Sequence, residues 1–194
     1  MSLKNKMKKI IVIFLSALFV FGCTQKKPPN KETAEKYFTA RNSVEFKEIQ
    51  DLISDSLTVI EGDYKMLYSQ DSYYEVFKWD SVFQTSYEIV ELKEIDEQII
   101  VSISLSSIRN KFLKNDLMTC QFKLSFESGR ISKIESLDCK DANWEVWQKR
   151  VNILADWIED NHPELHGFIH DMTMKGAKNY LKAINLYELN ENDL

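Results

Sequence analysis

The chain has 194 residues, of which 44% are hydrophobic, 12% aromatic and 28% charged, and its formal net charge is −5. This length suits one ordinary domain, and the hydrophobic content is sufficient for a core, which excludes general disorder. The acidic chain has no cluster of Lys and Arg with interleaved aromatic residues, so it is excluded from the nucleic-acid-binding proteins.

The N-terminus has the pattern of a bacterial export signal. A lysine-rich start over residues 1–9 precedes the apolar run Ile10–Phe21. That run is too short to span a membrane, which requires about 20 residues, so we interpret residues 1–22 as a signal peptide. The leader carries four lysines and no acid, and its removal takes the formal net charge to −9.

The leader ends in Val20-Phe21-Gly22-Cys23, which resembles the lipobox of bacterial lipoproteins. We therefore expect Cys23 to become the lipidated first residue and residues 23–31 to form a polar, proline-containing tether. Because no Asp follows Cys23, the resemblance to lipoproteins of two-membrane bacteria implies the cell envelope, at the outer membrane facing the periplasm. The alternative is an ordinary secretory signal followed by a chance cysteine.

The pattern from residue 32 predicts a single α+β domain that extends to residue 194. Its first part should contain helices over 32–39 and 44–53, a hairpin of strands 57–60 and 64–68, and a helix over 71–83. Four antiparallel strands should follow as a meander over 87–94, 98–108, 116–126 and 131–138. Helices should complete the chain over 143–161, from Pro163, and over 177–187.

The first of these segments resemble the nuclear transport factor 2-like superfamily, a cystatin-like cone fold shared with ketosteroid isomerases and polyketide cyclases. The resemblance rests on Tyr37-Phe38-Thr39-Ala40, Phe46, Leu52–Leu57 and Val59, and on the order of the elements. It implies a curved antiparallel sheet wrapped around N-terminal helices over residues 32–138, with additional C-terminal helices over 142–189. It also implies a pocket at the open end of the cone, which in this superfamily hosts isomerases, dehydratases, cyclases and simple ligand binders.

Aromatic residues are the candidates for lining such a pocket. Large rings supply apolar area and a few polar groups for a small hydrophobic or aromatic ligand, and the candidates are Tyr64, Tyr73, Tyr74, Trp79 and Tyr87. The alternative is that these rings belong to the core. No catalytic residue can be assigned, because the strands contain no histidine and their acids fall where solvent-facing residues or turns are expected.

Two further residue pairs have a chemical interpretation. Cys120 and Cys139 form an even pair in an oxidising compartment, and a β-bulge would align them, so we expect a structural disulfide. The alternative is two reduced, partly buried thiols. His166 and His170 are spaced to share a helical face and are weak metal candidates, but a surface role is favoured and neither a metal nor a cofactor is expected.

These observations favour a non-enzymatic cell-envelope lipoprotein that is attached to the membrane through lipid on Cys23. Its domain would bind a small ligand or an envelope protein partner, and no nucleic acid. The alternative is an isomerase, dehydratase or cyclase that uses the cone pocket. A third hypothesis is metal binding through the histidines.

Overall fold

The computed structural model describes residues 29–43 and 45–192, without the side chain of Asn192. The expected signal peptide, the lipidation site Cys23 and most of the expected tether lie outside the described residues. The last two tether residues, Asn30 and Lys31, are instead the first residues of a helix. Within the described residues, no helix is both long and apolar enough to cross a membrane.

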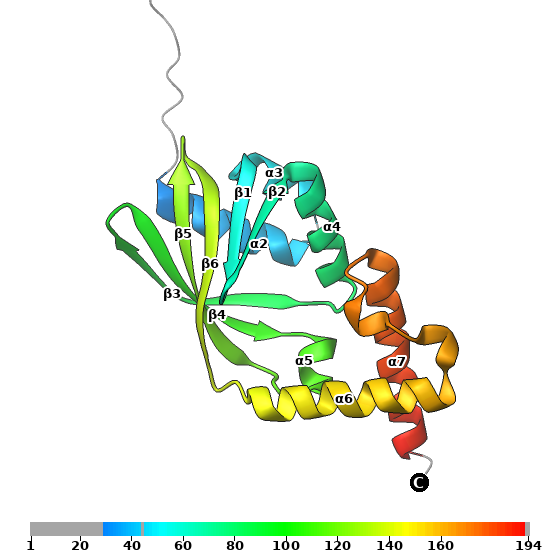
Figure 1. Cartoon of the computed structure of the whole chain (residues 1–194). Coiled ribbons are helices and arrows are strands. Elements are labelled where there is room, and N and C mark those ends of the chain that lie inside the picture. The colour runs from blue at the N-terminus through cyan, green and yellow to red at the C-terminus, as the bar shows by residue number, and fades with distance from the viewer. Residues whose placement is uncertain (1–28, 44, 193–194) are drawn as a thin grey trace, which may run out of the picture.

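The first half of the domain alternates helices with a hairpin (Figure 1). Its elements are α2 (Asn30–Ser43), α3 (Phe46–Leu52), β1 (Ile53–Glu61), β2 (Tyr64–Ser69) and α4 (Gln70–Ser81). The strands of the meander are β3 (Ser86–Ile95), β4 (Gln98–Ser106), β5 (Met118–Glu127) and β6 (Arg130–Lys140), with the short α5 (Ile108–Phe112) between β4 and β5. The chain ends in α6 (Trp144–Asn161), two 3-10 turns (Pro163–Leu165 and Phe168–His170) and α7 (Met174–Asn192).

The six strands form one curved sheet in the order β2-β1-β6-β5-β4-β3. The meander from β3 to β6 is antiparallel, as the sequence predicts. The expectation of an entirely antiparallel sheet is corrected at one place, because β1 pairs with β6 in parallel and makes the sheet mixed. The alternation of apolar residues identifies a strand and its faces but carries no information about the direction of its neighbour.

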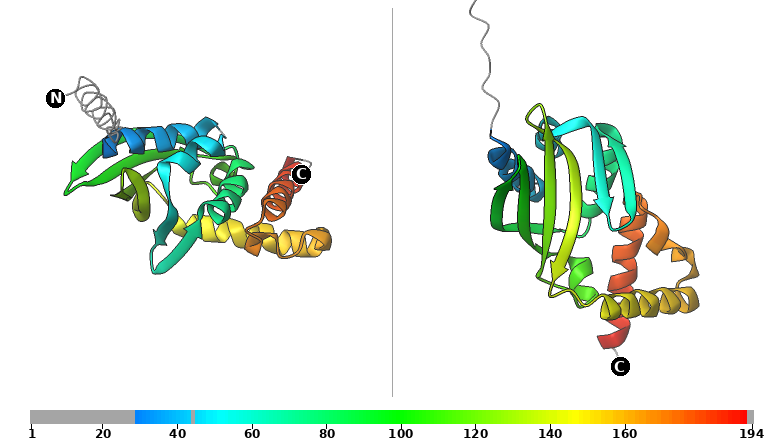
Figure 2. Two further views of the ribbon diagram at one scale, coloured as in Figure 1. Left: turned by 90° about the horizontal axis from the view of Figure 1, so that it is seen from above. Right: turned by 60° about the vertical axis from the view of Figure 1, so that its left-hand side comes forward.

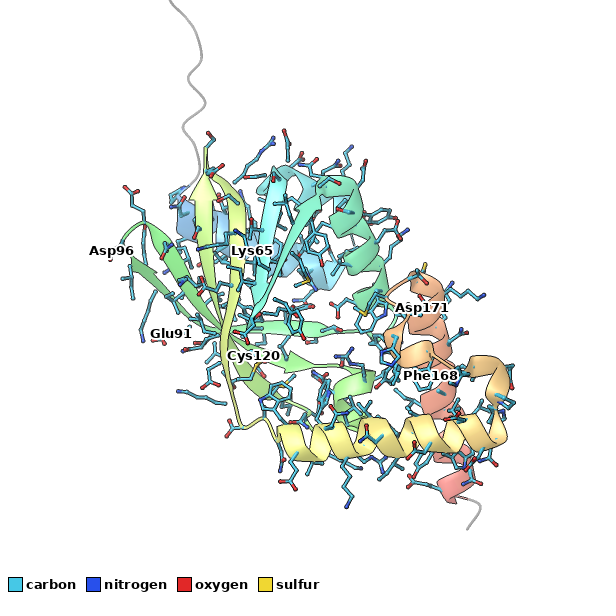
Figure 3. All side chains as sticks on the ribbon, in the orientation of Figure 1. Lys65, Glu91, Asp96, Cys120, Phe168 and Asp171 are labelled. Atoms are coloured by element: carbon cyan, nitrogen blue, oxygen red, sulfur yellow. A yellow bond between two sulfur atoms is a disulfide. The ribbon has the colours of Figure 1, made fainter. Side chains whose placement is uncertain are left out.

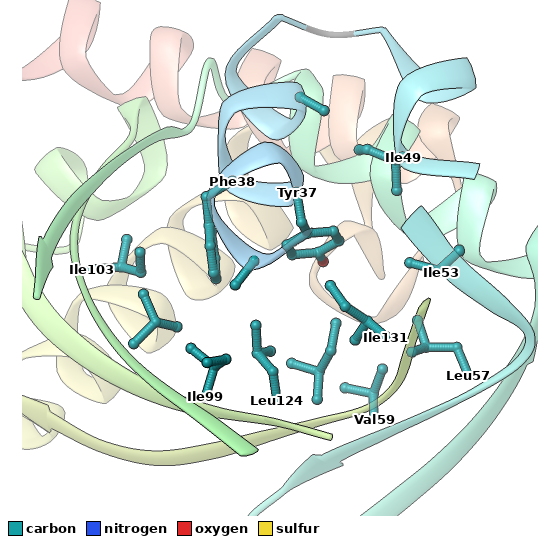
Figure 4. Packing of buried hydrophobic residues seen from close by; sticks show 14 of the residues in the cluster. Tyr37, Phe38, Ile49, Ile53, Leu57, Val59, Ile99, Ile103, Leu124 and Ile131 are labelled. Atoms are coloured by element: carbon teal, nitrogen blue, oxygen red, sulfur yellow. The ribbon is translucent and has the colours of Figure 1, made fainter. Parts of the chain in front are cut away.

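Helix α2 covers the concave face of the sheet (Figure 2). Ala34, Tyr37 and Phe38 lie on one side of this helix and are at most 4% exposed. Figure 4 shows Phe38 above Ile99 and Leu124 of the sheet. Burying a side chain such as Phe38 contributes about 1.5–3 kcal/mol, so this contact is a main attachment of α2 to the sheet.

The last two helices form a second apolar cluster beside the cone. Leu154 and Ile158 of α6 are at most 1% exposed and pack with Tyr180 and Ile184 of α7. The helix expected from Pro163 is wrong: Gly167, at φ +80°, separates two 3-10 turns. Trp147 packs against both clusters, so it joins the helical extension, which runs from α6 to α7, to the cone.

The register of β5 against β6 brings Cys120 opposite Cys139. The two-residue turn Ser128-Gly129 has φ of +55° and +82°, the signs of a type I′ hairpin, and would by itself place Cys120 opposite Leu137. Two bulges in β6, each adding one residue, shift the register by two. The cysteines form a disulfide, with their Cα atoms 3.9 Å apart.

We expect this disulfide to stabilise the domain by about 3 kcal/mol, the value for a closed loop of this size. The bridged cysteines are separated by 19 positions in the sequence. Replacing both by alanine (Cys120→Ala with Cys139→Ala) should lower the free energy of unfolding by that amount in urea titrations. Reductant should lower the free energy of unfolding of the wild type by a similar amount and should leave that of the double variant unchanged. Equal free energies of unfolding in all samples would contradict a structural role for the disulfide.

Candidate functional site

A cavity of about 670 Å³ lies between the sheet, α4 and the start of α6. This volume falls within the range of small-molecule pockets, about 300–1,000 Å³. Most of the wall is apolar, with contributions from Phe38, Val76, Phe83, Leu105, Met118, Phe122 and Ile134. Two arginines, Arg41 and Arg109, also line the cavity. Burying a charged side chain costs free energy unless partners compensate the charge.

Arg41 belongs to a polar group that we call the Arg41 cluster: Tyr37, Arg41, Tyr73, Asp80, Thr85 and Tyr87. Helix α2 presents Tyr37 and Arg41 one turn apart, which places both on its buried side. The Nη1 atom of Arg41 donates to the hydroxyls of Tyr73 at 3.0 Å and Tyr37 at 3.2 Å, and these two hydroxyls bond to each other. The cluster therefore connects α2 to α4 beside the cavity.

Asp80, near the end of α4, is the acceptor for the other side of the cluster. Its Oδ2 atom receives a hydrogen bond from Arg41 Nη2 at 2.6 Å and another from the hydroxyl of Tyr87. Its Oδ1 atom receives one from the Thr85 hydroxyl at 3.0 Å. Because both carboxylate oxygens are occupied within the protein, Asp80 is poorly placed to accept a proton from a ligand.

The electrostatics shift the pKa of three members of this cluster, Arg41, Tyr73 and Tyr87. Burial opposes the charged form of Arg41, but Tyr87, the other hydroxyls and Asp80 outweigh it and hold the pKa of Arg41 well above its ordinary value. Burial also raises the pKa of Tyr73 and of Tyr87, with Arg41 acting in the opposite direction. At neutral pH these tyrosines are hydrogen-bonding hydroxyls and not bases.

The other charged group of the cavity lies among indole rings. The guanidinium carbon of Arg109 is 4.9 Å from the ring centroid of Trp79 and 5.0 Å from that of Trp147. Trp79 donates its indole N–H to the backbone oxygen of Asp171 at 3.3 Å, in the segment before α7. The helical extension thus supplies or holds the rings around Arg109.

Asn115 determines where α6 begins at the mouth of the cavity. This residue is 3% exposed, and its amide side chain receives a hydrogen bond from the backbone of Asn143 and returns one to it, at 2.6 and 3.1 Å. Asn143 in turn accepts from Val146 N at 3.0 Å and so forms the N-cap of α6. Trp144 and Trp147, in the first turn, are thereby directed towards the cavity that both line.

Three of the five aromatic candidates line the cavity and two do not. Tyr73, Trp79 and Tyr87 are lining residues. The assignment of Tyr64 to the cavity is corrected, because this residue is 77% exposed at the turn end of β2. The assignment of Tyr74 to the cavity is also corrected. The adjacent Tyr73 takes the inner side of α4, so Tyr74 turns outward, is 40% exposed, and has its ring centroid 4.5 Å from that of Phe46 with the two rings tilted.

Sequence reasoning missed the charged members of the site. Arg41 lies four residues after Tyr37, on the apolar side of its helix, and a charge in that position is a detectable signal of a buried polar contact. Asp80 lies on α4 seven residues, or two turns, after Tyr73 and could have been found in the same way. Arg109 gave no such signal, because the five-residue α5 is too short to show a periodicity.

The acids of strands β3 to β6 lie away from the cavity, and Glu61, at the end of β1, lines it. Glu91 and Asp96 project from the β3–β4 hairpin into solvent (Figure 3). Glu135 is half-buried, but it pairs with Lys123 at 2.8 Å, whose hydrogen bond lowers the pKa of Glu135. These positions agree with the solvated face that the sequence predicts.

The structure does not bring His166 and His170 together on one helix. His166 follows the first 3-10 turn and His170 ends the second, with Gly167 between them. Both are exposed. In the part of the chain that the structure describes, no three His, Cys, Asp or Glu side chains are grouped so that they could hold a metal ion.

Comparison with known proteins supports the fold. No protein-family model and no curated protein match the sequence. Among solved structures, a protein from Kribbella flavida matches 63% of this chain and 96% of its own, with a TM-score of 0.50 and 9% identity. IdmH from Streptomyces antibioticus, described as a proposed polyketide cyclase, matches 64% of this chain and 99% of its own (TM-score 0.49, 9% identity).

An NTF2-like protein of unknown function from Cytophaga hutchinsonii matches 59% of this chain and 93% of its own, with a TM-score of 0.48 and 9% identity. The domain, with N-terminal helices, a curved mixed sheet and C-terminal helices, has a fold similar to that of the Kribbella flavida protein, in agreement with the cone architecture expected from the sequence. At these identities the likeness concerns the fold alone.

The buried tyrosine hydroxyls predict a loss of stability in alkaline solution. The pKa of Tyr73 is raised in the folded state, so its contribution is complete below the unfolded value of about 10 and is lost as the pH rises towards the folded value. The free energy of unfolding, measured in urea between about pH 9 and 12, should fall less steeply in Tyr73→Phe than in the wild type. Equal slopes would contradict this assignment.

Proposed function

We propose that this protein is a cell-envelope lipoprotein whose cavity binds a small, largely apolar ligand. The observation that carries the proposal is the cavity itself, about 670 Å³ in volume and walled by aromatic and aliphatic side chains. Apolar side chains that line a cavity of this size lack contacts that they would make in a closely packed interior. A ligand of matching shape would restore them.

Several observations favour binding over catalysis. A general base must be free to take a proton from the ligand. Asp80 is the acid nearest the centre of the polar group, and its oxygens are occupied by Arg41, Tyr87 and Thr85. The pKa of Tyr73 and of Tyr87 is raised by burial, which leaves their hydroxyls protonated.

The same hydroxyls support a second candidate function, that of an isomerase, dehydratase or cyclase. Protonated Tyr73 and Tyr87 beside a charged Arg41 can donate hydrogen bonds to an oxygen that gains negative charge during proton abstraction. Solved structures of the same fold include proteins described as a proposed ketosteroid isomerase and proposed polyketide cyclases. An enzyme would return its co-purified ligand chemically altered after incubation, which NMR of the recovered compound would detect.

Binding can be measured on the chain from Thr24 onwards, because every described contact lies within residues 29–192. N-phenylnaphthylamine, a neutral aromatic dye, should bind with increased fluorescence. Val76→Trp, which places an indole in the cavity, should raise the dye's Kd at least about tenfold, equivalent to 1.4 kcal/mol. Val90→Trp is the matched control, since Val90 is 60% exposed on β3; identical binding by all three proteins would contradict a ligand-binding cavity.

The envelope assignment rests on residues 1–31 and has its own test. In bacteria grown with labelled palmitate, the full chain should take up the label and sediment with membranes. Cys23→Ala removes the acylated thiol and should abolish the label, whereas Cys120→Ala should retain it. Equal labelling of wild type and Cys23→Ala would show that Cys23 is not the acylated residue.

A further inference from the structure

Arg109 differs from the other arginines of the chain. Arg41 pairs with Asp80 at 2.6 Å, and Arg130 and Arg150 pair with Asp55 and Glu191 at 3.5 and 3.7 Å. No ion pair or hydrogen bond within residues 29–43 and 45–192 involves the guanidinium of Arg109. It nevertheless lines the cavity.

Aromatic rings surround the side chain of Arg109 but accept no hydrogen bond from its guanidinium N–H groups. Its guanidinium carbon lies 4.9 Å from the Trp79 ring, 5.0 Å from the Trp147 ring and 5.7 Å from the Phe83 ring. Cation–π contacts of this kind attract the charge through the ring faces. They do not replace in-plane hydrogen-bond acceptors, so the N–H groups of Arg109 remain able to bind a ligand.

The acids of the cavity do not compensate this charge. Asp80 is committed to Arg41, while Glu61 and Glu75 are exposed, and Glu75 pairs with Lys78 at 2.6 Å. Exposed carboxylates are screened by water and salt, whereas a partly buried cation is screened much less. Burial accordingly lowers the pKa of Arg109, with Tyr180 and Asp80 opposing that effect. A partner anion inside the cavity would remove this electrostatic cost.

We propose that the ligand of this cavity is an apolar molecule with one carboxylate, and that Arg109 binds the carboxylate. The planar guanidinium fork matches a carboxylate with two parallel hydrogen bonds, and such charge-assisted bonds are about twice as strong as neutral ones. The apolar part of the ligand would contact Leu105, Met118 and Phe122. This inference rests on the proposed function, since it names the class of ligand for the same cavity.

The test compares two probes of nearly equal size that differ in charge, pyrenebutyrate and its neutral amide, pyrenebutanamide. In a cavity without an anion site the amide would bind more tightly, because a carboxylate is costlier to desolvate. We expect the wild type to bind pyrenebutyrate at least as tightly as the amide. This comparison needs no variant, so it holds even where a substitution prevents folding.

Arg109→Gln should raise the Kd of pyrenebutyrate about tenfold or more, and that of the amide less than about threefold. Arg130→Gln is the matched control, because Arg130 is 47% exposed and lies at the β5–β6 turn, and it should leave both values unchanged. A purely structural role for Arg109 would weaken both probes alike. If the wild type bound the amide more tightly than pyrenebutyrate, the carboxylate site would be overturned and the ligand-binding cavity would stand. If the wild type bound neither probe, the proposed function itself would be overturned.

Discussion

The parallel pairing of β1 with β6 is the contact on which the architecture depends. It joins the hairpin near the start of the domain to the last strand of the meander, so that a single sheet extends from β2 to β3. Helix α4 follows edge strand β2, packs against β1 and β2, and precedes β3, the strand at the other edge. The cavity exists because α2 and α4 cover the concave side of the sheet without filling it completely.

Two arginines in one cavity illustrate different solutions to the cost of burying charge. Arg41 is surrounded by acceptors, with Asp80 as its counter-ion and three tyrosine hydroxyls as further partners. The hydrogen bonds of its two terminal nitrogens fix the position of α2 against α4, since each of them would leave an unpaired buried group if it were broken, whereas the buried Nε of Arg41 has no partner among the described residues. The guanidinium of Arg109 lies among rings, lines the cavity and has no hydrogen-bond or ion-pair partner among the described residues.

The helical extension contributes to the site as well as to stability. Trp147 belongs to the packing of both apolar clusters and to the wall of the cavity. Asn115 and Asn143 hold the first turn of α6 in place, and Asp171, before α7, accepts the hydrogen bond of Trp79. A cone that ended at β6 would lack the rings of Trp144 and Trp147.

The sequence by itself determined the local features of this protein. The order of helices and strands and the apolar side of each follow from periodicities of about 3.6 and 2 residues, which depend on the backbone alone. The cone fold was implied by the resemblance of residues 32–138 to a known superfamily. Cys120 and Cys139 could be paired once a bulge was allowed, because register can be counted from a turn.

Only the tertiary structure decided what depends on contacts between distant segments. The parallel direction of β1, the positions of both bulges and the outward turn of Tyr64 and Tyr74 have no local periodic signal. The same holds for the site: Arg41, Asp80 and Tyr87 meet from three elements, and the isolation of Arg109 is visible only when every neighbouring side chain is placed. The physical reason is that burial and charge compensation are properties of the assembled cavity and not of any one segment.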